Sequence, residues 1–377
     1  MKYVDDFRDG ELARRIAQRV HAAVEPGRRY RLMEFCGGHT HAIARYGLAA
    51  LLPRCVELLH GPGCPVCVLP VGRIDNAIEL ALEHRVTLCT YGDTLRVPAS
   101  RQMSLYKARA AGADVRVVYS SADALALARA LPERQVVFFG IGFETTTPPS
   151  AVALLAARAE RLANFSVFGN HVLTPAAMRH LLAGDEANLD GFIGPSHVST
   201  IIGAAPYRAI AREHRKPVVI TGFEPLDVLQ AVLMLVMQIN EGRADTENQF
   251  TRAVTEHGNQ KAQALVAQTF ELRDEFEWRG LGLVPHSALA VSAVFSPWDA
   301  ERRFGLLARP VSDVKACLCG QILRGHGKPA DCKVFGTACT PATPLGACMV
   351  SSEGACAAHY QYARFGDEAT TARSVRQ

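Results

Sequence analysis

Cysteines are the residues of this sequence most able to do chemistry, and the chain has eleven of them. Cys64 and Cys67 lie in the segment GPGCPVCV, where two residues separate them, and Cys36 lies directly before GGHTH. A Cys-x-x-Cys pair can serve as a redox dithiol, as half of a zinc site or as a ligand pair for iron. The side chains that the fold brings beside the pair decide between these uses.

Both cysteine groups follow segments that we expect to form β-strands. Cys36 follows the run Tyr30–Phe35, and Cys64 follows Cys55–Leu59 through the loop HGPG. In a parallel sheet, ligands gather beyond the carboxyl ends of the strands, so the three thiols converge on one pocket if these strands are neighbours. The glycines beside both groups allow the two backbones to approach closely. A helix is expected to begin soon after Cys36, and its dipole would favour the thiolate there.

Two further side chains are candidates for the same pocket. His39 and His41 point in different directions on a helix, and we favour His39 as the one that faces the thiols. A hydrogen bond at the start of the helix is the alternative explanation for His39. Glu144, in GFETTTP, follows another predicted strand at a position that needs no helix cap. The same edge could be lined by four more polar residues, namely Asp93, Asn170, His171 and His197.

The chain alternates short β-branched runs with segments of helical spacing, which predicts an α/β fold with parallel sheets. The expected strands are Tyr30–Phe35, Cys55–Leu59, Val86–Thr90, Val115–Tyr119, Val136–Gly140, Phe165–Phe168, Gly191–Ile193 and Pro217–Thr221. Cys55 and Cys89 lie inside such strands and are expected to belong to the core. VVFFGIGFETTTP and PVVITGFEPLD both run from a strand through Gly-Phe-Glu to a helix start with proline. This likeness indicates two similar Rossmann-like units, or a chance resemblance of two strand-helix junctions.

The composition excludes several classes of protein. The formal charge of +4 is small for 377 residues, and the basic residues form no stripe, so nucleic acid is not an expected partner. The N-terminus MKYVDDFRDGELARR lacks the apolar segment of a secretory signal, and the longest apolar stretch, Val228–Ile239, is too short to cross a bilayer. We therefore expect a cytoplasmic protein without a membrane segment. In a reducing compartment, metal binding and thiol chemistry explain the cysteines better than a disulfide framework does.

The C-terminal part of the chain has a different character. A polar, helix-like stretch is expected over Glu241–Glu277, and the segment Val311–Tyr360 is rich in Gly and Pro and holds six cysteines. Their spacing, C-x-C-x12-C-x6-C-x8-C-x7-C, contains none of the paired C-x2-C knuckles of a zinc ribbon. Irregular loops of small residues favour an iron–sulfur cubane, whose sulfides accept backbone N–H bonds, over zinc or structural disulfides. A cubane needs four cysteines, which leaves two for thiol or disulfide chemistry. We place the three units at residues 1–143, 144–240 and 241–377.

Four motifs, in order, resemble those of one known family. EFCGGHTHAI, GPGCPVCV, GFETTTP and the run from Cys317 to Cys356 are similar to the hydrogenase-formation protein family HypD, over nearly the whole chain. The resemblance implies a scaffold on which the Fe(CN)2CO group of NiFe hydrogenases is assembled with a small chaperone of the HypC type. It also implies that cyanide arrives from HypE as a protein-bound thiocyanate, and that the group later passes to the hydrogenase large subunit. The implied fold has two α/β units and a cluster unit.

The resemblance also implies roles for particular cysteines. Cys36, Cys64 and Cys67 would handle iron, and the C-terminal unit would hold a 4Fe-4S cluster. The cluster surroundings are similar to those of ferredoxin:thioredoxin reductase, in which the first cysteine of a C-x-C is a ligand and the second does redox work. On that likeness we predict four cluster ligands and one redox pair. The ligands are Cys317, Cys332, Cys339 and Cys356, and the pair is Cys319 and Cys348.

The chemistry of the implied cargo agrees with these residues. Fe(II) that carries cyanide and carbon monoxide is a soft metal centre, for which thiolates are natural ligands. Its assembly calls for electrons that free cyanide from sulfur, and a cluster beside a dithiol can relay them. We therefore predict that Cys64 and Cys67 form a reversible redox couple in addition to holding iron.

Two other functions are compatible with the same residues. An iron–sulfur disulfide reductase would use Cys64 and Cys67 as its dithiol, but it would not need Cys36 and the GGHTH loop. A Cys3His zinc enzyme would use His39 as the fourth ligand.

Overall fold

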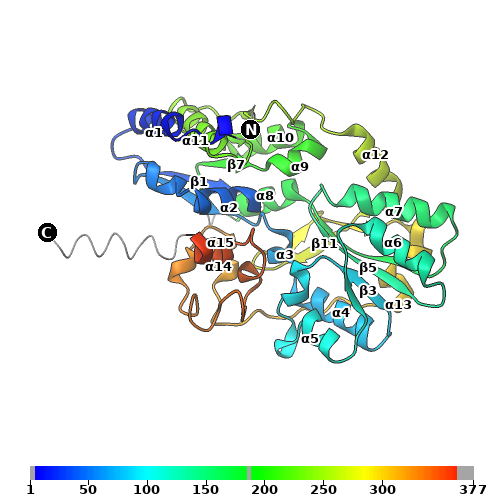
Figure 1. Ribbon diagram of the computed structural model, residues 1–377. Coiled ribbons are helices and arrows are strands. Elements are labelled where there is room, and N and C mark those ends of the chain that lie inside the picture. The colour runs from blue at the N-terminus through cyan, green and yellow to red at the C-terminus, as the bar shows by residue number, and fades with distance from the viewer. Residues whose placement is uncertain (1–4, 185–187, 363–377) are drawn as a thin grey trace.

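The computed structural model describes residues 5–184 and 188–362, which form two separate β-sheets with helices on their faces and a C-terminal unit made mostly of loops (Figure 1). The α/β class predicted from the sequence is confirmed, with parallel strands in both sheets. Within the described residues no helix is both long enough and apolar enough to span a membrane.

The first sheet has five parallel strands in the order β2-β1-β7-β8-β9. These are β1 Tyr30–Glu34, β2 Val56–His60, β7 Gly191–Gly194, β8 Val218–Ile220 and β9 Thr246–Asn248. One face is covered by α1 Gly10–Ala23, α2 Gly37–Arg45 and α11 Pro225–Asn240, and the other packs against α10 Ala205–His214. β1 and β2 are in register up to Glu34 and His60, so that both strands end at the same edge of the sheet.

The second sheet has six strands in the order β10-β13-β6-β5-β3-β4. These are β3 Thr87–Thr90, β4 Val115–Val117, β5 Val136–Gly142, β6 Phe165–Val172, β10 Phe270–Leu272 and β13 Ala288–Val291. The first four are parallel, whereas β13 and β10 are antiparallel additions at one side. One face is covered by α6 Ser121–Ala130, α7 Thr147–Ala159 and α12 Gln260–Thr269, and the other by α4 Val71–Leu82 and α5 Leu105–Ala110. A separate hairpin is formed by β11 Glu275–Trp278 and β12 Gly282–Pro285.

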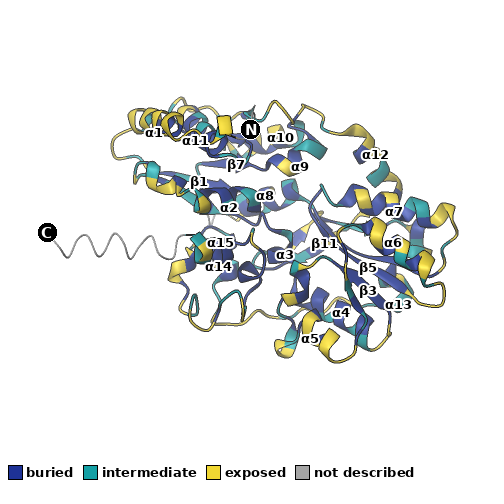
Figure 2. Cartoon of the chain, viewed as in Figure 1, coloured by how far each residue is buried: buried dark blue, intermediate teal, exposed yellow. Residues whose placement is uncertain are grey.

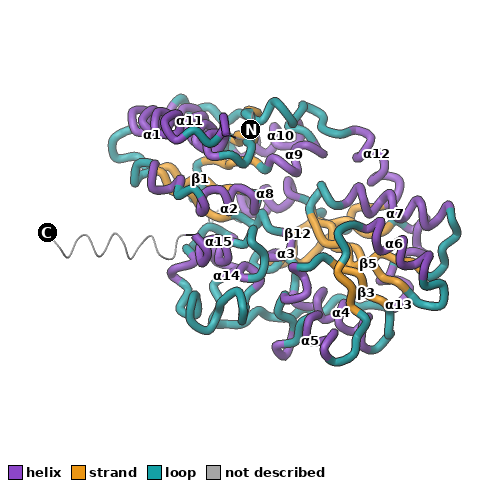
Figure 3. Tube along the Cα trace, viewed as in Figure 1, coloured by secondary structure: helices purple, strands orange, loops and turns teal. Residues whose placement is uncertain are grey.

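Several shorter elements complete the described chain. The remaining α-helices are α3 Pro65–Val68, α8 Thr174–Ala183, α9 Ser196–Ile202, α13 Ala300–Phe304, α14 Cys319–Leu323 and α15 Ala355–Tyr362. Turns of 3-10 helix lie at Asp5–Phe7, Leu48–Leu51, Asp93–Arg96, Ser100–Gln102, Ala293–Trp298, Pro329–Asp331 and Ala347–Met349. Loops connect the short helices of the C-terminal unit around α14 and α15, as Figure 3 shows.

All eight strands predicted from the sequence are present, each within a few residues of its expected bounds. Both Gly-Phe-Glu segments also connect a strand to a helix, β5 to α7 and β8 to α11. The expectation of a helix over Glu241–Glu277 is wrong except for α12. The segment also supplies β9 and β10, which lie at the edges of the two sheets. Edge strands are short and carry polar side chains, so this stretch has no apolar run that would indicate a strand.

The chain does not complete one sheet before it begins the next. β1 and β2 belong to the first sheet, β3 to β6 to the second, and β7 to β9 to the first again. The sequence boundaries at 143 and 240 therefore do not coincide with the borders of the sheets, because β5 and β6 pair along their whole length across residue 143.

A shared apolar core joins the two sheets to the C-terminal unit. It includes Met33 and Leu59 of the first sheet, Val137 and Phe139 of the second, and Ile322 of α14. Figure 2 shows buried residues along both sheets and exposed residues on outer helices such as α1 and α6. The C-terminal unit is thus packed against both sheets despite its few regular elements, and it lies beside the ends of β1 and β2 through contacts of α15 with α2.

Candidate functional site

The ends of β1 and β2 bring the two N-terminal cysteine groups together. The N–H of Gly37, which follows Cys36, donates to the carbonyl oxygen of Gly63, which precedes Cys64, at 3.0 Å. A Cβ atom on Gly63 would lie 2.4 Å from the backbone nitrogen of Cys36, so only glycine allows this approach. The two strands are therefore neighbours, as the convergence of the thiols requires, and the loops that carry the thiols touch.

Cys36 is buried and precedes the first residue of α2. The expected preference for the thiolate is wrong for this folded chain. Burial raises the pKa of the Cys36 thiol, and the nearby carboxylates of Glu353 and Glu34 raise it further, although the Gly38 and His39 N–H groups oppose the rise. Desolvation at this depth exceeds the effect of the helix N-terminus. Cys36 therefore carries a proton until something in the pocket replaces it.

Glu34, which sequence reasoning did not select, organises the backbone around Cys36. Its buried carboxylate accepts hydrogen bonds from the Cys36 N–H at 3.0 Å and from the Thr40 hydroxyl, and it pairs with His60 Nδ1 at 3.1 Å. A glutamate directly after the apolar Leu32 and Met33 of a strand is the signal that could have identified it, because buried carboxylates need several partners.

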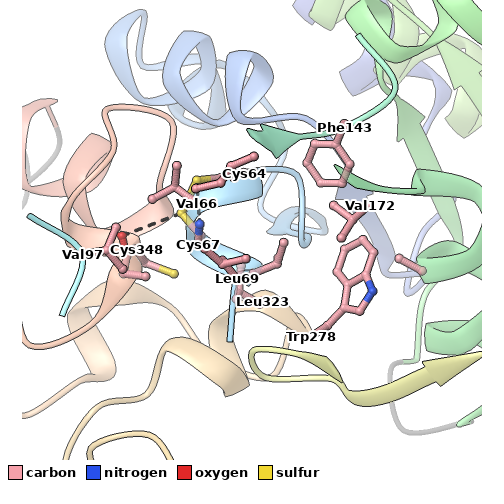
Figure 4. Close-up of a cluster of buried hydrophobic side chains, with 14 of the residues drawn as sticks. Cys64, Val66, Cys67, Leu69, Val97, Phe143, Val172, Trp278, Leu323 and Cys348 are labelled. Atoms are coloured by element: carbon pink, nitrogen blue, oxygen red, sulfur yellow. Dashed lines mark hydrogen bonds between the residues drawn. A yellow bond between two sulfur atoms is a disulfide. The ribbon is translucent and has the colours of Figure 1, made fainter. Parts of the chain in front are cut away.

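Cys64 and Cys67 form a disulfide at the start of α3, with their Cα atoms 5.2 Å apart. Cys67 Sγ lies 3.9 Å from the carbonyl oxygen of Ala347, the residue before Cys348. Figure 4 shows the pair beside Cys348, inside a group of buried apolar side chains. The Cys-x-x-Cys turn can therefore close a disulfide, and it does so next to the C-terminal cysteines. The reversibility of this bond stays a prediction.

His39 is buried, and its ring nitrogen Nε2 lies 3.0 Å from the Gly222 carbonyl oxygen and 3.2 Å from that of Thr221. Its ring packs on Phe223 at 4.9 Å between ring centroids. Burial lowers the pKa of His39, which keeps the imidazole neutral. The alternative expected from the sequence, a hydrogen bond at the start of the helix, is not found, because the ring instead contacts the second Gly-Phe-Glu loop. Among the described residues Nδ1 has no hydrogen-bond partner.

Glu144 is buried, and its carboxylate contacts the first residue of α8 rather than facing an open cleft. One carboxylate oxygen accepts from the Thr174 N–H at 2.9 Å and the other from the Thr174 hydroxyl at 3.1 Å. Burial raises the pKa of Glu144 to about 7. Burial likewise raises the pKa of Tyr207, with Glu144 and Cys36 both close enough to add to the effect. Glu144 and Cys36 therefore approach the same buried tyrosine from the two sheets.

The other polar residues considered from the sequence have different surroundings. Asn170 accepts a hydrogen bond from Arg73, and His171 Nε2 pairs with the Ser150 hydroxyl at 3.0 Å. His197 packs on Phe223, and His39 contacts the same phenyl ring. Asp93 lies within electrostatic range of Glu353. Only His197 and Asp93 thus approach the surroundings of Cys36.

The C-terminal unit gathers four of its cysteines into one sulfur network. The thiols of Cys317, Cys348 and Cys356 all lie close enough to Cys319 to influence its pKa. The neighbouring Cys319 lowers the pKa of Cys317 to about 7. Cys319 and Cys348, the predicted redox pair, are thus neighbours, and both are free thiols. Cys319 lies at the centre of the network rather than at its side.

The two remaining C-terminal cysteines are buried near this network. Cys339 Sγ accepts a hydrogen bond from the Leu345 N–H at 3.3 Å and is close enough to Cys356 to influence it electrostatically. Cys332 Sγ lies 3.8 Å from the carbonyl oxygen of Ala316. All six cysteines therefore belong to one small region, and the choice of four ligands among them stays a prediction.

Glu353 connects the C-terminal unit to Cys36. A Cβ atom on Gly37 would lie 2.4 Å from Glu353 Cβ and 2.9 Å from Oε2. Burial raises the pKa of Glu353, and the charges of Asp93 and Glu34 add to the rise. This contact could not be predicted from the sequence, because it depends on the packing of α15 against α2.

Neither the N-terminal thiols nor the C-terminal cysteines form a ready site for a metal ion within the described residues. In residues 5–184 and 188–362, no three or more His, Cys, Asp and Glu side chains are grouped as ligands of one metal ion. At the strand ends the Cys64–Cys67 disulfide occupies two of the three thiols that would bind iron. The assignment of iron to Cys36, Cys64 and Cys67 stays a prediction that requires the reduced pair.

The protein is of the α/β class, and its candidate centre is based on thiols. These thiols lie at adjoining strand ends, beside a cysteine-rich unit. The family model for HypD, described as the hydrogenase formation hypA family, matches residues 11–363. The chain therefore belongs to the HypD family.

Relatives resemble the chain over almost its whole length. The hydrogenase maturation factor HypD of Cupriavidus necator is 62% identical over 373 residues, which cover 97% of this chain and 98% of that protein. The factor of the same name from Azotobacter vinelandii is 63% identical over 369 residues, with 97% of each chain covered. That of Escherichia coli is 46% identical over 374 residues, which cover 98% of this chain and 100% of the relative.

Proposed function

We propose that this protein is a hydrogenase maturation factor on which the Fe(CN)2CO group is assembled before it passes to the hydrogenase large subunit. Membership of a family whose relatives are named hydrogenase maturation factors supports the general role. The observation that carries the specific role is the junction of Cys36 with the Cys64–Cys67 pair at the ends of β1 and β2. A HypC-type chaperone and the cyanide donor HypE would be the partners, in the cytoplasm.

In this proposal the cargo iron is bound by thiolates. Cys36, Cys64 and Cys67 would supply three sulfur ligands once the disulfide is reduced, and soft Fe(II) with cyanide and carbon monoxide prefers such ligands. Glu34 holds the Cys36 backbone through its N–H, so the thiol keeps its place while its proton is exchanged for iron. The disulfide would block loading, and reduction would permit it.

In this proposal the C-terminal unit holds a 4Fe-4S cluster, and the grouping of its cysteines supports the assignment. Its cysteines are concentrated in a buried region of small residues, and a Cβ atom on Gly346 would lie 2.5 Å from Cys317 Sγ and 2.6 Å from Cys319 Sγ. The Leu345 N–H already donates to a cysteine sulfur. Cys317, Cys332, Cys339 and Cys356 would be the ligands, and the cluster would supply one electron at a time when bound.

In this proposal the Cys64–Cys67 dithiol uses these electrons to release cyanide from sulfur. A protein thiocyanate, R–S–CN, reacts with two thiols to give R–SH, hydrogen cyanide and a disulfide, so that two electrons pass from the thiols to the sulfur–carbon bond. In this proposal Cys64 and Cys67 supply those thiols, and their disulfide lies beside Cys348. The neighbouring Cys319 and Cys348 would return the pair to its reduced form by thiol–disulfide exchange and become the disulfide themselves. His39, on α2, would support the pocket through its contact with the second Gly-Phe-Glu loop, and Glu144 would support it from the second sheet.

One observation also favours the second candidate function, an iron–sulfur disulfide reductase. The Cys64–Cys67 disulfide lies beside the C-terminal cysteines, as the active dithiol of such an enzyme would. Cys36 separates the two proposals, because a reductase needs only the pair, whereas iron loading needs the third thiol.

The test is infrared spectroscopy of the complex with the HypC-type chaperone, purified without oxygen, together with iron and sulfide analysis. The parent should show cyanide and carbonyl bands and contain about four cluster irons per chain. Cys36→Ser should lose the bands and keep the cluster, whereas Cys55→Ser, outside the pocket, should keep both. Bands of full intensity in Cys36→Ser would remove Cys36 from the proposal and favour the reductase.

A further inference from the structure

One buried charged side chain outside the thiol groups lacks adequate partners. Arg279 follows β11, and only 2% of its side chain is exposed. Within the described residues its Nε and Nη2 atoms make no hydrogen bond. Its ion-pair partner is Asp313, with 3.2 Å between Nε and Oδ1, and the Asp313 side chain is 41% exposed. A guanidinium so far from water is unfavourable unless it serves another negative group.

Backbone contacts hold Arg279 between the two cysteine motifs. Its N–H donates to the Val68 carbonyl oxygen at 2.7 Å, at the end of the short helix that carries Cys67. The next residue, Gly280, packs on Gly320, which follows Cys319. A Cβ atom on Gly280 would lie 2.7 Å from the Gly320 Cα. The position of Arg279 is therefore fixed relative to both motifs.

The charge of Arg279 acts on the C-terminal cysteines. It lies within electrostatic range of Cys317 and of Cys348. Asp313 lies within the same range of Cys317. A buried positive charge and a half-exposed negative one thus lie beside the same sulfur, and little solvent separates the buried one from it.

We propose that Arg279 is a positioning residue for the redox chemistry of the C-terminal unit, where its charge stabilises the reduced, more negative state of the bound 4Fe-4S cluster. This inference rests on the proposed function, because it requires the cluster. Reduction adds one electron and breaks no bond, so the neighbouring charge alone changes the equilibrium. Charges and hydrogen bonds around such clusters are known determinants of their reduction potentials. Arg279 would make the cluster easier to reduce and so help it receive electrons for the Cys64–Cys67 disulfide.

The experiment is a redox titration of the full-length protein, followed by electron paramagnetic resonance of the reduced cluster. Arg279→Met should lower the ratio of reduced to oxidised cluster about tenfold at a fixed ambient potential, which is 59 mV for a one-electron couple. Arg279→Lys keeps the charge and should shift the ratio much less. Asp313→Asn should shift it the other way, by a smaller factor because solvent screens that carboxylate. Arg129→Gln, in a surface ion pair with Glu160, is the matched control and should leave the ratio unchanged.

The outcomes are distinguishable. Equal shifts in the Met and Lys variants, or no shift in either, would overturn the role of the charge while the proposed function stands. A parent protein without a four-iron cluster would overturn both. Should Arg279→Met fail to retain its cluster, a clear shift in Asp313→Asn beside a small one in Arg279→Lys still decides, because a residue needed only for packing predicts no shift in Asp313→Asn.

Discussion

The two cysteine groups of this protein are held in place by different means. Cys36 and Cys64 stand at the ends of β1 and β2, where regular backbone hydrogen bonds fix the distance between the loops. The C-terminal cysteines lie on loops and on three short helical segments, where Cys319 is near Cys317, Cys348 and Cys356. Sheet pairing thus positions the first group, whereas no strand pairing connects the segments of the second. In the proposed function the first group is loaded and emptied, and the second holds a permanent cluster.

The largest effect expected from this comparison is loss of the cluster. Cys317→Ser and Cys356→Ser should each abolish the brown colour and the acid-labile sulfide, because in the proposed assignment each removes a cluster ligand. Cys319→Ser and Cys348→Ser should retain the colour, measured by absorbance and iron content of anaerobic protein. Cys319 lies near Cys317, Cys348 and Cys356. If Cys319→Ser bleached the protein and Cys332→Ser kept the colour, Cys319 would be a ligand in place of Cys332, and the predicted ligand set would be wrong.

The second prediction concerns the connection between the two groups. In the parent, differential thiol labelling against redox potential should reveal a two-electron transition at Cys64 and Cys67. In Cys332→Ser, without its cluster, the reduction of this disulfide should slow about tenfold or more, because the nearby electron relay is gone. Cys89→Ser is the matched core control and should reduce at the parental rate. An unchanged rate in Cys332→Ser would mean that the two groups work independently.

The third prediction concerns Glu144, which follows β5 of the second sheet. Since burial raises its pKa from the usual 4.5 to about 7, the folded chain binds this proton more tightly than the unfolded chain does. Stability from this group is therefore lost as the pH rises through that range, by up to about 3 kcal/mol between about pH 4.5 and about pH 8.

Glu144→Gln should remove most of that decline in the free energy of unfolding, measured with denaturant at a series of pH values. Glu224→Gln, at the matching position of the other Gly-Phe-Glu loop, breaks a largely exposed pair with Arg8 and should cost about 1 kcal/mol or less. Parallel pH profiles of the parent and Glu144→Gln would contradict the buried, protonated carboxyl.

The smallest effect is expected at His39. His39→Ala removes the hydrogen bond to the second Gly-Phe-Glu loop but no thiol, so the cyanide and carbonyl bands should weaken several-fold rather than vanish. His41→Ala, on the same helix but paired with Tyr362, is the control and should keep full band intensity. Bands of parental intensity in His39→Ala would reduce this residue to a packing role.

Much of the first group could be predicted from the sequence, because apolar β-branched runs mark the strands and the cysteines follow them. The partition of the strands between two sheets could not be predicted, since the pairing of β1 with β7 leaves no local signal. Glu34 and Glu353 were missed for related reasons. One is a single carboxylate in an apolar strand, and the other reaches Cys36 only through packing of distant helices.

The C-terminal group was predictable as a cluster of cysteines but not in its geometry. Spacing identified the region, yet loops without periodicity do not indicate which sulfurs meet. The protonated state of Cys36 was also mispredicted, because the sequence revealed the helix start but not the depth of burial or the neighbouring carboxylates.

The order in which the strands enter the two sheets has a consequence for synthesis. β1 lies between β2 and β7, and β7 begins only at Gly191, so the nascent chain leaves the ribosome with one side of β1 unpaired while the whole parallel part of the second sheet is made. Contacts between segments so distant along the chain form slowly. Cys36 and Cys64 therefore spend this interval in an incomplete sheet, and their pocket closes only after α15, near the end of the described chain, reaches α2. Because of this topology, the thiol site is completed only near the end of translation.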